Sequence, residues 1–285
     1  MVLPFQMDLS GKVIAVTGGG GILCSCIAEA LGKCGAKVAV LDLRQDAAQA
    51  VASKITKDGG TAVGIECNVL QRESLEKAAE EMREKLGACD ILINGAGGNH
   101  PRGTTAQEFI TKDLLAQASE DAATFYDLDP EGVQFVFNLN FLGTLLPTQV
   151  FTRQMAASGS GTILNVSSMS AFVPLTKVPA YSAAKAAISN FTEWLAVYFA
   201  KAGIRVNAIA PGFFLTEQNR TLLTNPDGTM TERGRKIIDH TPMGRYGEPE
   251  DLIGTVLWLL SDTGAGFVTG TVIPIDGGFN AYSGV

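Results

Sequence analysis

The sequence has no apolar run that approaches the ~20 residues of a membrane-spanning helix. Residues 1–8 also lack the basic start and long apolar stretch of a secretory signal, so we expect a cytoplasmic protein. Lysine and arginine form no block, and the net charge is −7. These features argue against nucleic acids and membranes as partners, and an acidic chain that binds anionic ligands must place its positive groups locally.

Cysteine is too sparse and too irregularly spaced to indicate a disulfide framework or a metal site. The five cysteines are odd in number, all lie in the first third of the chain and show no metal-ligand spacing. Most fall at core-like positions, which predicts reduced thiols at Cys24, Cys26, Cys34, Cys67 and Cys89. We therefore expect no bound metal.

What the sequence does contain is a regular alternation of strand-like and helical segments. Its 285 residues, with 46% hydrophobic content, are within reach of one large α/β domain. We expect strands at 12–16, 37–41, 61–66, 90–94, 162–166, 205–209 and 271–275, and helices at 22–35, 45–57, 71–86, 132–157, 180–201 and 248–260. This order predicts a single domain, 1–285, with a Rossmann-type doubly wound parallel sheet of about seven strands and helices on both faces.

A glycine-rich turn follows the first expected strand. Thr17-Gly18-Gly19-Gly20-Gly21 leads into a helix, and this order forms a pyrophosphate site because backbone N–H groups and the helix dipole face the anion. The second strand ends at Asp42, whose carboxylate can bind both hydroxyls of an adenosine ribose and repels a 2′-phosphate. The pattern favours NAD(H) over NADP, although Arg44 could receive the phosphate.

A tyrosine and a lysine four residues apart lie in a run of good helix formers. The spacing places Tyr181 and Lys185 on one helical face, and Ser168 lies thirteen residues before Tyr181, just after an apolar strand. A phenol is a poor base at pH 7, since its ordinary pKa is about 10, but a nearby ammonium favours the phenolate and a serine can hold the substrate oxygen. Such a set can move a proton on or off an alcohol. On spacing alone, a buried tyrosine beside a surface lysine would look the same.

Several motifs in this order resemble the short-chain dehydrogenase/reductase family over nearly the whole sequence. Besides the features above, they are Asn94-Gly95-Ala96-Gly97, Asn140 in Asn-Leu-Asn-Phe-Leu-Gly, and Pro211-Gly212, which follow or accompany expected strands and helices. The resemblance implies that Tyr181 exchanges the proton, Ser168 binds the oxygen, Lys185 holds the nicotinamide ribose and Asn140 anchors a water. It also implies cofactor contacts at Gly18, Gly21, Ile22, Asp42, Asn68, Val69, Asn94, Ala96, Gly97, Tyr181, Lys185, Pro211, Gly212, Phe214 and Thr216.

The sequence differs from the family pattern at three places. The usual T-G-x-x-x-G-I-G reads TGGGGILC, which we interpret as a turn one residue shorter, with Leu23 in place of the last glycine. The usual N-N-A-G has Gly95 as its second residue. The Asp-Val that often meets adenine is Asn68-Val69, and an amide can still hydrogen-bond the adenine edge.

Two long segments, 98–130 and 213–247, interrupt the regular alternation of strands and helices, and both follow the carboxyl ends of expected strands. Ligands of open α/β sheets bind there, so both segments are candidates for substrate walls and a lid, although either could be a subunit contact or a surface excursion. The polar and basic substrate candidates in or near this mouth are Asn99, His100, Arg102, Lys177, Asn219 and Arg220. Their character favours a small anionic substrate over a steroid or lipid.

Within the family, segments such as GAGGNHP and HTPMGRYG look most similar to the D-mannonate oxidoreductases of the short-chain type, also called fructuronate reductases. This resemblance implies NAD(H)-dependent interconversion of D-mannonate and D-fructuronate in carbohydrate catabolism, by a homotetramer or dimer. Gluconate 5-dehydrogenase, or another aldonate or polyol dehydrogenase, stays open as an alternative. So do an NADP-linked reductase of apolar ketones and a catalytically silent dinucleotide-binding sensor.

Overall fold

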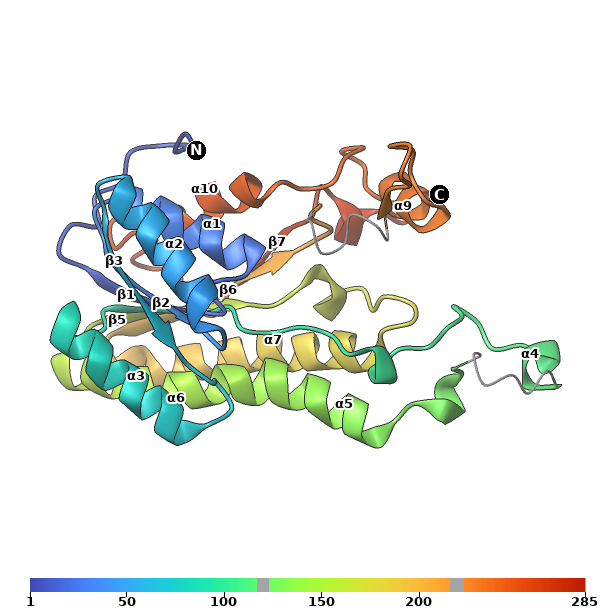
Figure 1. Cartoon of the computed structure of the whole chain (residues 1–285), viewed down its shortest axis with the longest axis horizontal. Helices are drawn as coiled ribbons and strands as arrows, with labels where there is room; N and C mark the ends of the chain where they lie inside the picture. The colour runs from blue at the N-terminus through green and yellow to red at the C-terminus, as the bar shows by residue number, and fades with distance from the viewer. Residues whose placement is uncertain (117–122, 216–222, 285) are drawn as a thin grey trace.

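The computed structural model describes residues 1–116, 123–215 and 223–284. Their strands form one parallel seven-stranded sheet in the order β3-β2-β1-β4-β5-β6-β7, with helices on both sides (Figure 1). The expected Rossmann-type doubly wound fold is therefore confirmed. The strand order changes direction between β1 and β4, and ligands of such sheets bind beyond the carboxyl ends of the strands at this point.

The strands are short apolar runs, because both faces of this sheet are covered. Their bounds are β1 Val13–Thr17, β2 Lys37–Asp42, β3 Thr61–Glu66, β4 Ile91–Asn94, β5 Gly161–Val166, β6 Ile204–Pro211 and β7 Val272–Ile275. Successive side chains of β1 enter opposite cores, since Ile14 packs in one hydrophobic cluster and Ala15 in the other. The register places Thr17 beside Asn94 and Asn94 beside Asn165, so the central strands end at one edge.

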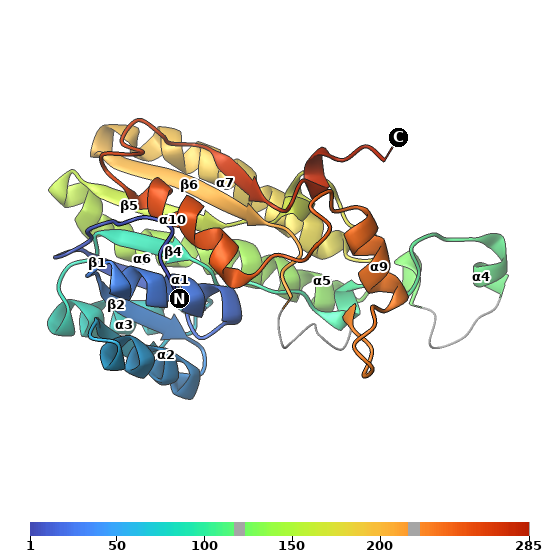
Figure 2. The same ribbon diagram turned by 90° about the horizontal axis from the view of Figure 1, so that it is seen from above.

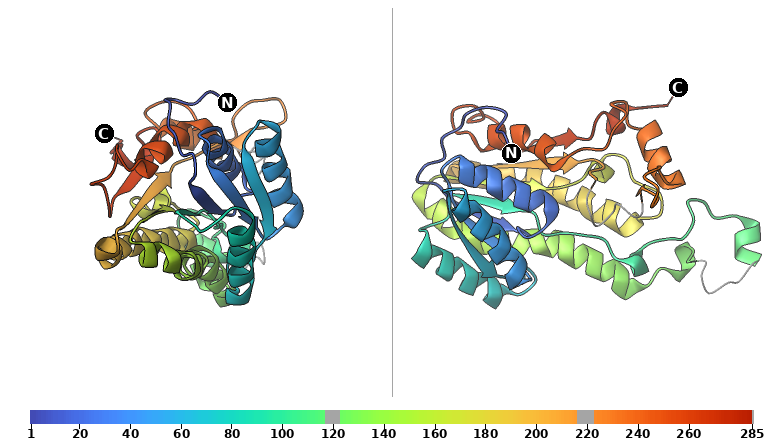
Figure 3. Two further views of the ribbon diagram at one scale, coloured as in Figure 1. Left: turned by 90° about the vertical axis from the view of Figure 1, so that its left-hand side faces the viewer. Right: turned by 45° about the horizontal axis from the view of Figure 1, so that its top comes forward.

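Two helical layers enclose the sheet (Figure 3). One layer contains α1 (Ile22–Lys33), α2 (Gln45–Lys57) and α10 (Ile253–Leu260), which is preceded by the 3₁₀ turn η6 (Pro249–Leu252). The other contains α3 (Arg72–Lys85), α6 (Gly143–Ser158) and α7 (Pro179–Phe199), which is followed by η5 (Ala200–Ala202). Each layer has its own core, and the sheet separates the two.

The helix expected over 132–157 is longer and carries a distortion. α5 (Pro130–Phe137), a π-helical turn η3 (Asn138–Leu142) and α6 follow one another directly. Asp129 caps the start, where its side chain accepts a hydrogen bond from the Glu131 amide. Asn140 lies inside the π turn and is fully buried. Such turns are frequent at functional sites because they re-aim a side chain within an otherwise regular helix.

Both inserted segments stand at the carboxyl end of the sheet. The first contains η1 (Pro101–Gly103), α4 (Lys112–Ala116) and η2 (Phe125–Asp127), and the second contains α9 (Glu232–Asp239). Figure 2 shows α4 on an arm that extends away from the body, beyond α9. The C-terminal turn η7 (Phe279–Ala281) lies close to α9, with the rings of Phe279 and His240 6.2 Å apart.

The five cysteines are buried free thiols, as expected. In the part of the sequence that the structure describes, no helix is both long enough and apolar enough to cross a bilayer.

Candidate active site

Ser168, Tyr181 and Lys185 meet where β5 ends and α7 begins. Ser168 precedes the short turn η4 (Met169–Ala171) and caps it, since its Oγ accepts a hydrogen bond from the Ser170 amide at 3.2 Å. α7 starts at a proline, whose fixed φ suits the first helical position and whose missing N–H costs nothing there. Tyr181 and Lys185 lie one turn apart on this helix, and Ser168 lies near enough to the Tyr181 hydroxyl to lower the pKa of the phenol.

Lys185 is a buried ammonium with a backbone acceptor. The residue is 4% exposed, and Nζ donates to the Val166 carbonyl at 2.9 Å. Nζ also lies 5.6 Å from the centroid of the Tyr181 ring. Burial lowers the pKa of Lys185 to about 8, and interaction with the Cys24 thiol opposes this shift. The ammonium is therefore still mostly charged at pH 7.

The phenol of Tyr181 titrates above its ordinary range. Burial raises the pKa of Tyr181, and the hydrogen bond with Ser168 counters only part of that rise. We expected the Lys185 ammonium to lower this pKa, but desolvation of the phenolate outweighs any such effect in this structure. At pH 7 the Tyr181 side chain is therefore a neutral phenol, which can donate a proton.

Asn140 ties the π turn to the segment after β4. Its Nδ2 donates to the carbonyls of Val136 at 2.8 Å and Gly98 at 2.7 Å, and its Oδ1 accepts from the Gly98 amide at 3.3 Å. Gly97 passes close by, since a β-carbon there would lie 2.7 Å from Asn140 Oδ1 and 3.1 Å from Lys185 Nζ. The structure thus places Asn140, Gly97 and Lys185 side by side.

The glycine-rich turn after β1 forms a cradle with the turn after β4. Gly18 has φ +63°, and a β-carbon on it would lie 2.9 Å from the Ala96 Cα. Glycine is required here, because an L side chain would be strained by the backbone and would meet the opposite segment. Thr17 fastens the two turns, since its Oγ1 accepts from the amides of Gly95 at 3.1 Å and Ala96 at 3.3 Å.

The start of α1 and the end of β2 complete a set of groups that fits a dinucleotide. Gly21 precedes α1 in an extended conformation and offers no side-chain cap, which leaves the first N–H groups of the helix available to an anion such as pyrophosphate. The Asp42 carboxylate accepts from the amides of Gly20 and Arg44, each at 3.0 Å. A carboxylate has about four acceptor sites, so two remain for ribose hydroxyls.

Cys24 is the residue of α1 that contacts the turn after β4. Cys24, and not Leu23, therefore stands in place of the last glycine of the family motif, so our interpretation of Leu23 is wrong. A β-carbon on Gly95 would overlap the Cys24 sulfur, so Cys24 makes the close helix contact for which the family motif uses its last glycine. Counted from Thr17, Cys24 is the eighth residue, as that glycine is in the family pattern. The turn therefore keeps its full length, and α1 begins at Ile22.

The side chain of Asn94, a predicted cofactor residue, makes hydrogen bonds inside the protein. It is 1% exposed, and Nδ2 donates to Thr148 Oγ1 at 3.0 Å and to Asn165 Oδ1 at 2.9 Å. Asn165 in turn donates to Thr192 Oγ1 at 2.9 Å. This buried series of polar groups links β4 and β5 to α6 and α7, and thereby fixes the end of β4 near the site.

The other predicted cofactor residues lie along the same edge of the sheet. The Asn68 side chain accepts from the Leu70 amide at 3.0 Å, and Val69 beside it is buried. Pro211 ends β6, the Gly212 amide donates to Ile275 at 2.9 Å, and Phe214 is buried. Thr216 lies outside the described residues.

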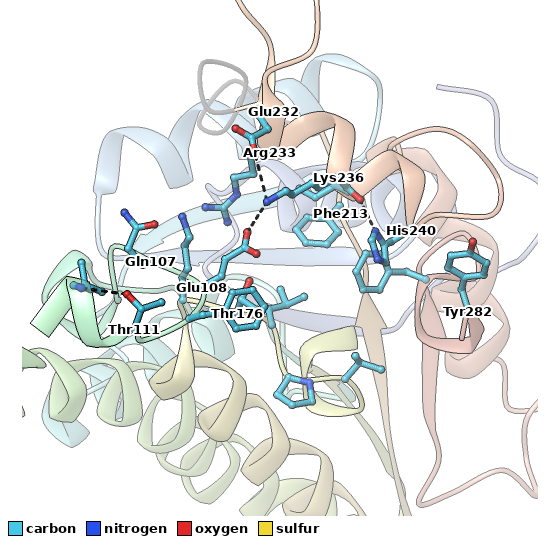
Figure 4. A pocket seen from close by; sticks show the side chains of 18 of the residues that line it. Gln107, Glu108, Thr111, Thr176, Phe213, Glu232, Arg233, Lys236, His240 and Tyr282 are labelled. Atoms are coloured by element: carbon cyan, nitrogen blue, oxygen red, sulfur yellow. Dashed lines mark hydrogen bonds and ion pairs between the residues drawn. The ribbon is translucent and has the colours of Figure 1, made fainter. Parts of the chain in front are cut away.

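A cavity of about 960 Å³ opens between the two inserted segments (Figure 4). It is bounded by the first segment, the loop between Ser168 and Tyr181, α9 and the C-terminal tail. Its lining consists of Gln107, Glu108, Phe109, Thr111, Asp113, Leu114, Val173, Pro174, Leu175, Thr176, Lys177, Phe213, Glu232, Arg233, Lys236, Ile237, His240, Phe279 and Tyr282. The size is typical of small-molecule sites.

Of the six predicted substrate residues, Lys177 lines this cavity, whereas Asn99, His100 and Arg102 do not. Asn99 donates to Thr104 Oγ1 at 3.1 Å. The His100 side chain caps η1, where its Nδ1 accepts from the Arg102 amide at 3.2 Å.

The guanidinium of Arg102 is occupied by acidic neighbours, since it forms ion pairs with Asp129 and Glu131. The other two predicted substrate residues, Asn219 and Arg220, lie outside the described residues.

Sequence reasoning missed Arg233, Lys236, Phe213 and Tyr282 as lining residues. A signal for the first two existed, because Arg233, Lys236, Ile237 and His240 follow the i, i+3, i+4, i+7 spacing of one helical face. α9 places that face against the cavity.

Comparison with known proteins gives matches over almost the whole sequence. A family model described as enoyl-(acyl carrier protein) reductase matches residues 21–280. An uncharacterised oxidoreductase of Haemophilus influenzae is 53% identical over 278 residues, which are 98% of this chain and 96% of that protein. An uncharacterised oxidoreductase of Bacillus subtilis is 52% identical over 284 residues, which are 100% of both proteins.

Solved structures show the same similarity. A Haemophilus influenzae protein that is assigned as a D-mannonate oxidoreductase and contains NAD has a TM-score of 0.93 and 53% identity, with 98% of both proteins covered. A gluconate 5-dehydrogenase of Burkholderia cenocepacia, in complex with NADP and tartrate, has a TM-score of 0.80 and 26% identity, with 96% of this chain and 97% of that protein covered.

The fold and the site together define an oxidoreductase with a dinucleotide cradle. More narrowly, the chain belongs to the short-chain dehydrogenase/reductase family, as its motifs indicated.

Proposed function

We propose that this protein is an NAD(H)-dependent oxidoreductase that interconverts a secondary alcohol and a ketone on a sugar acid, with D-mannonate and D-fructuronate as the favoured pair. The observation that carries the proposal is the meeting of Ser168, Tyr181 and Lys185 beside a glycine cradle. The cavity with basic side chains above the Ser168–Tyr181 loop supports an acidic substrate. The assignment of the Haemophilus influenzae relative supports D-mannonate.

The catalytic groups divide the proton transfer between them. In oxidation, Tyr181 as phenolate takes the alcohol proton, while Ser168 holds the alcohol oxygen by a hydrogen bond. The Lys185 ammonium offsets part of the desolvation cost of the phenolate, and in reduction the neutral Tyr181 phenol acts as the acid. The bound nicotinamide supplies the hydride acceptor or donor. Lys185 also contacts the nicotinamide ribose, and Asn140 anchors a water that connects Lys185 to solvent.

Asp42 sets the preference for NAD(H). A carboxylate at this place accepts hydrogen bonds from ribose hydroxyls and repels a 2′-phosphate. The Haemophilus influenzae structure contains NAD, which is consistent with this assignment. The further cofactor contacts that we propose are Gly18, Gly21, Ile22, Asn68, Val69, Asn94, Ala96, Gly97, Pro211, Gly212, Phe214 and Thr216.

A second substrate, gluconate, is favoured by one specific finding. The Burkholderia cenocepacia enzyme is a gluconate 5-dehydrogenase that binds tartrate, a hydroxy acid, on the same fold. Its identity to this chain is only 26%, compared with 53% for the protein assigned to D-mannonate, so D-mannonate is our first choice.

We also propose that the enzyme is a cytoplasmic homo-oligomer, either a tetramer or a dimer. An exposed aromatic row on α7 supports an assembly, since Trp194 and Tyr198 are stacked 4.8 Å apart and are 54% and 66% exposed.

The deciding experiment measures NADH formation by the purified protein with D-mannonate, gluconate and other aldonates, each with NAD and with NADP. Strong turnover of D-mannonate with NAD alone is the expected result. Turnover of gluconate instead keeps the mechanism and changes the substrate. Binding of NADH without turnover of any aldonate contradicts the proposed function and favours a dinucleotide sensor.

A further inference from the structure

Three cationic side chains, Lys177, Arg233 and Lys236, line the cavity, and they differ in whether a carboxylate pairs with them. Lys236 Nζ lies 3.2 Å from Glu108 Oε1 and 3.4 Å from Glu232 Oε1, so it is shared by two carboxylates from opposite walls. Within residues 1–116, 123–215 and 223–284, neither Arg233 nor Lys177 forms an ion pair. In a protein with a net charge of −7, two such cations in one cavity are a feature to explain.

Lys177 is held in an unfavourable backbone conformation. Its φ is +71°, and among the described non-glycine residues it alone lies in the left-handed region. Its carbonyl accepts a hydrogen bond from the Thr105 amide at 2.8 Å, so the first inserted segment fixes this conformation. Strained backbone of this kind persists where the surroundings enforce it, and it clusters at ligand-binding positions.

Arg233 approaches the cavity from the opposite side. It belongs to the first turn of α9, and Figure 4 shows its side chain extending toward the wall that carries Gln107 and Glu108. A guanidinium offers parallel N–H donors that match the two oxygens of a carboxylate, and an ammonium adds a compact charge.

We propose that Arg233 and Lys177 form the carboxylate-binding pair of the substrate cavity, and that Lys236 keeps Glu108 and Glu232 engaged so that Arg233 stays free. This inference rests on the proposed function, which supplies a sugar acid as the ligand. Arg233 and Lys177 are specificity-determining residues, and Lys236 is a positioning residue because it acts on Arg233 through the two glutamates.

The role of Lys236 follows from where its two partners lie. Glu232 is adjacent to Arg233 in the sequence, and Glu108 faces Arg233 across the cavity in Figure 4. Without the Lys236 ammonium, both carboxylates would be available to pair with the guanidinium and compete with the substrate. The third acidic lining residue, Asp113, belongs to α4 on the arm.

The test uses the full-length enzyme with saturating NAD. Arg233→Gln and Lys177→Asn should each raise the KM for D-mannonate about 10- to 100-fold, the loss expected for a hydrogen bond to a charged group, while kcat changes little. Asparagine tolerates the left-handed conformation, so Lys177→Asn removes the charge without new strain. Arg235→Gln on the same helix is the matched control, since Arg235 is exposed and does not line the cavity.

Lys236→Met should raise the same KM, and adding Glu108→Gln and Glu232→Gln should lower it again. A merely structural role for Lys236 would give no such recovery, and a triple variant as weak as Lys236→Met overturns this part of the proposal.

Calorimetric titration of D-mannonate into the NADH-saturated enzyme separates this inference from the proposed function. If the wild-type enzyme turns over D-mannonate while Arg233→Gln and Lys177→Asn bind it as tightly as wild type, the function stands and the inference fails. If the wild-type enzyme turns over no aldonate but binds D-mannonate, and both substitutions weaken that binding, the function fails and the inference stands. If the wild-type enzyme neither binds D-mannonate nor turns over any aldonate, both are overturned.

Discussion

The sulfur of Cys24 occupies the space in which a side chain at Gly95 would begin. The two residues come from α1 and from the turn after β4, and a β-carbon on Gly95 would overlap Cys24 Sγ. The family pattern has a glycine where Cys24 stands and an asparagine where Gly95 stands, so the bulk of the contact has moved from one backbone to the other.

This relationship predicts coupled effects on stability. Gly95→Ala should destabilise the protein by about 1–3 kcal/mol, the usual cost of overpacking. In a Cys24→Ala background the cost should be smaller, because the Cys24 Cβ would lie an ordinary 3.6 Å from the new methyl group. Some cost should remain, since the Thr17 carbonyl oxygen would lie 2.9 Å away.

Urea unfolding of the two single variants and the double variant measures this coupling. A coupling energy above about 0.5 kcal/mol is expected for residues in contact, whereas additive costs would contradict the exchange.

The catalytic assignment predicts a separation of turnover from cofactor binding at Tyr181. Tyr181→Phe should lower kcat by about 10²–10⁴-fold, because positioned acid–base groups contribute that much. NADH binding, followed by fluorescence, should change little. Tyr126→Phe is the control, since Tyr126 is 73% exposed and does not line the cavity. Retention of activity in Tyr181→Phe would remove Tyr181 from the proton transfer.

Asp42 predicts the choice between the two nicotinamide cofactors. Asp42→Asn should raise the KM for NAD about 10- to 100-fold, since a charged hydrogen-bond acceptor to the ribose is lost. It should improve the use of NADP, since the repulsion of a 2′-phosphate is removed. Glu66→Gln is the control, because Glu66 is exposed on β3 in register with Asp42. An unchanged ratio of kcat/KM for the two cofactors would exclude this role.

The fold and the approach of Tyr181 to Lys185 could be predicted because they follow regular rules. Strand and helix periodicity located the elements to within a few residues, and the end of β2 at Asp42 fixed an acidic side chain at the ligand edge. The Tyr181–Lys185 spacing needed only the helical repeat. In these cases local sequence and tertiary structure agree.

The features of the site that the sequence did not predict depend on contacts between segments that are far apart in the sequence. Arg233 lines the cavity only because α9 folds back toward the first inserted segment, and no strand periodicity places that helix. Arg102 looked free in the sequence but pairs with Asp129, twenty-seven positions later. The rise in the pKa of Tyr181 is likewise a property of burial, which the spacing of motif residues does not determine.

Burial of the Lys185 ammonium predicts how stability changes with pH. In the folded protein the pKa is about 8 instead of the ordinary 10.5, so between these values the unfolded protein binds more protons than the folded one. Stability contributed by this group therefore rises with pH across that window. The free-energy cost of burying the Lys185 ammonium is fully present below pH 8 and absent above pH 10.5. The difference between the two pKa values corresponds to roughly 3 kcal/mol of stability.

Lys185→Met removes this titration, so the difference in the free energy of unfolding between variant and wild type should shift with pH. At pH 7.5 the variant should gain relative to wild type, because it buries no charge, and this gain should shrink by roughly 3 kcal/mol as the pH rises to 10.5. Urea unfolding at several pH values between these limits measures the shift. Lys201→Met is the control, because Lys201 is exposed and should give curves parallel to wild type. Parallel curves for Lys185→Met as well would mean that Lys185 carries no such cost, and that the enzyme holds its ammonium near Tyr181 without a loss of stability.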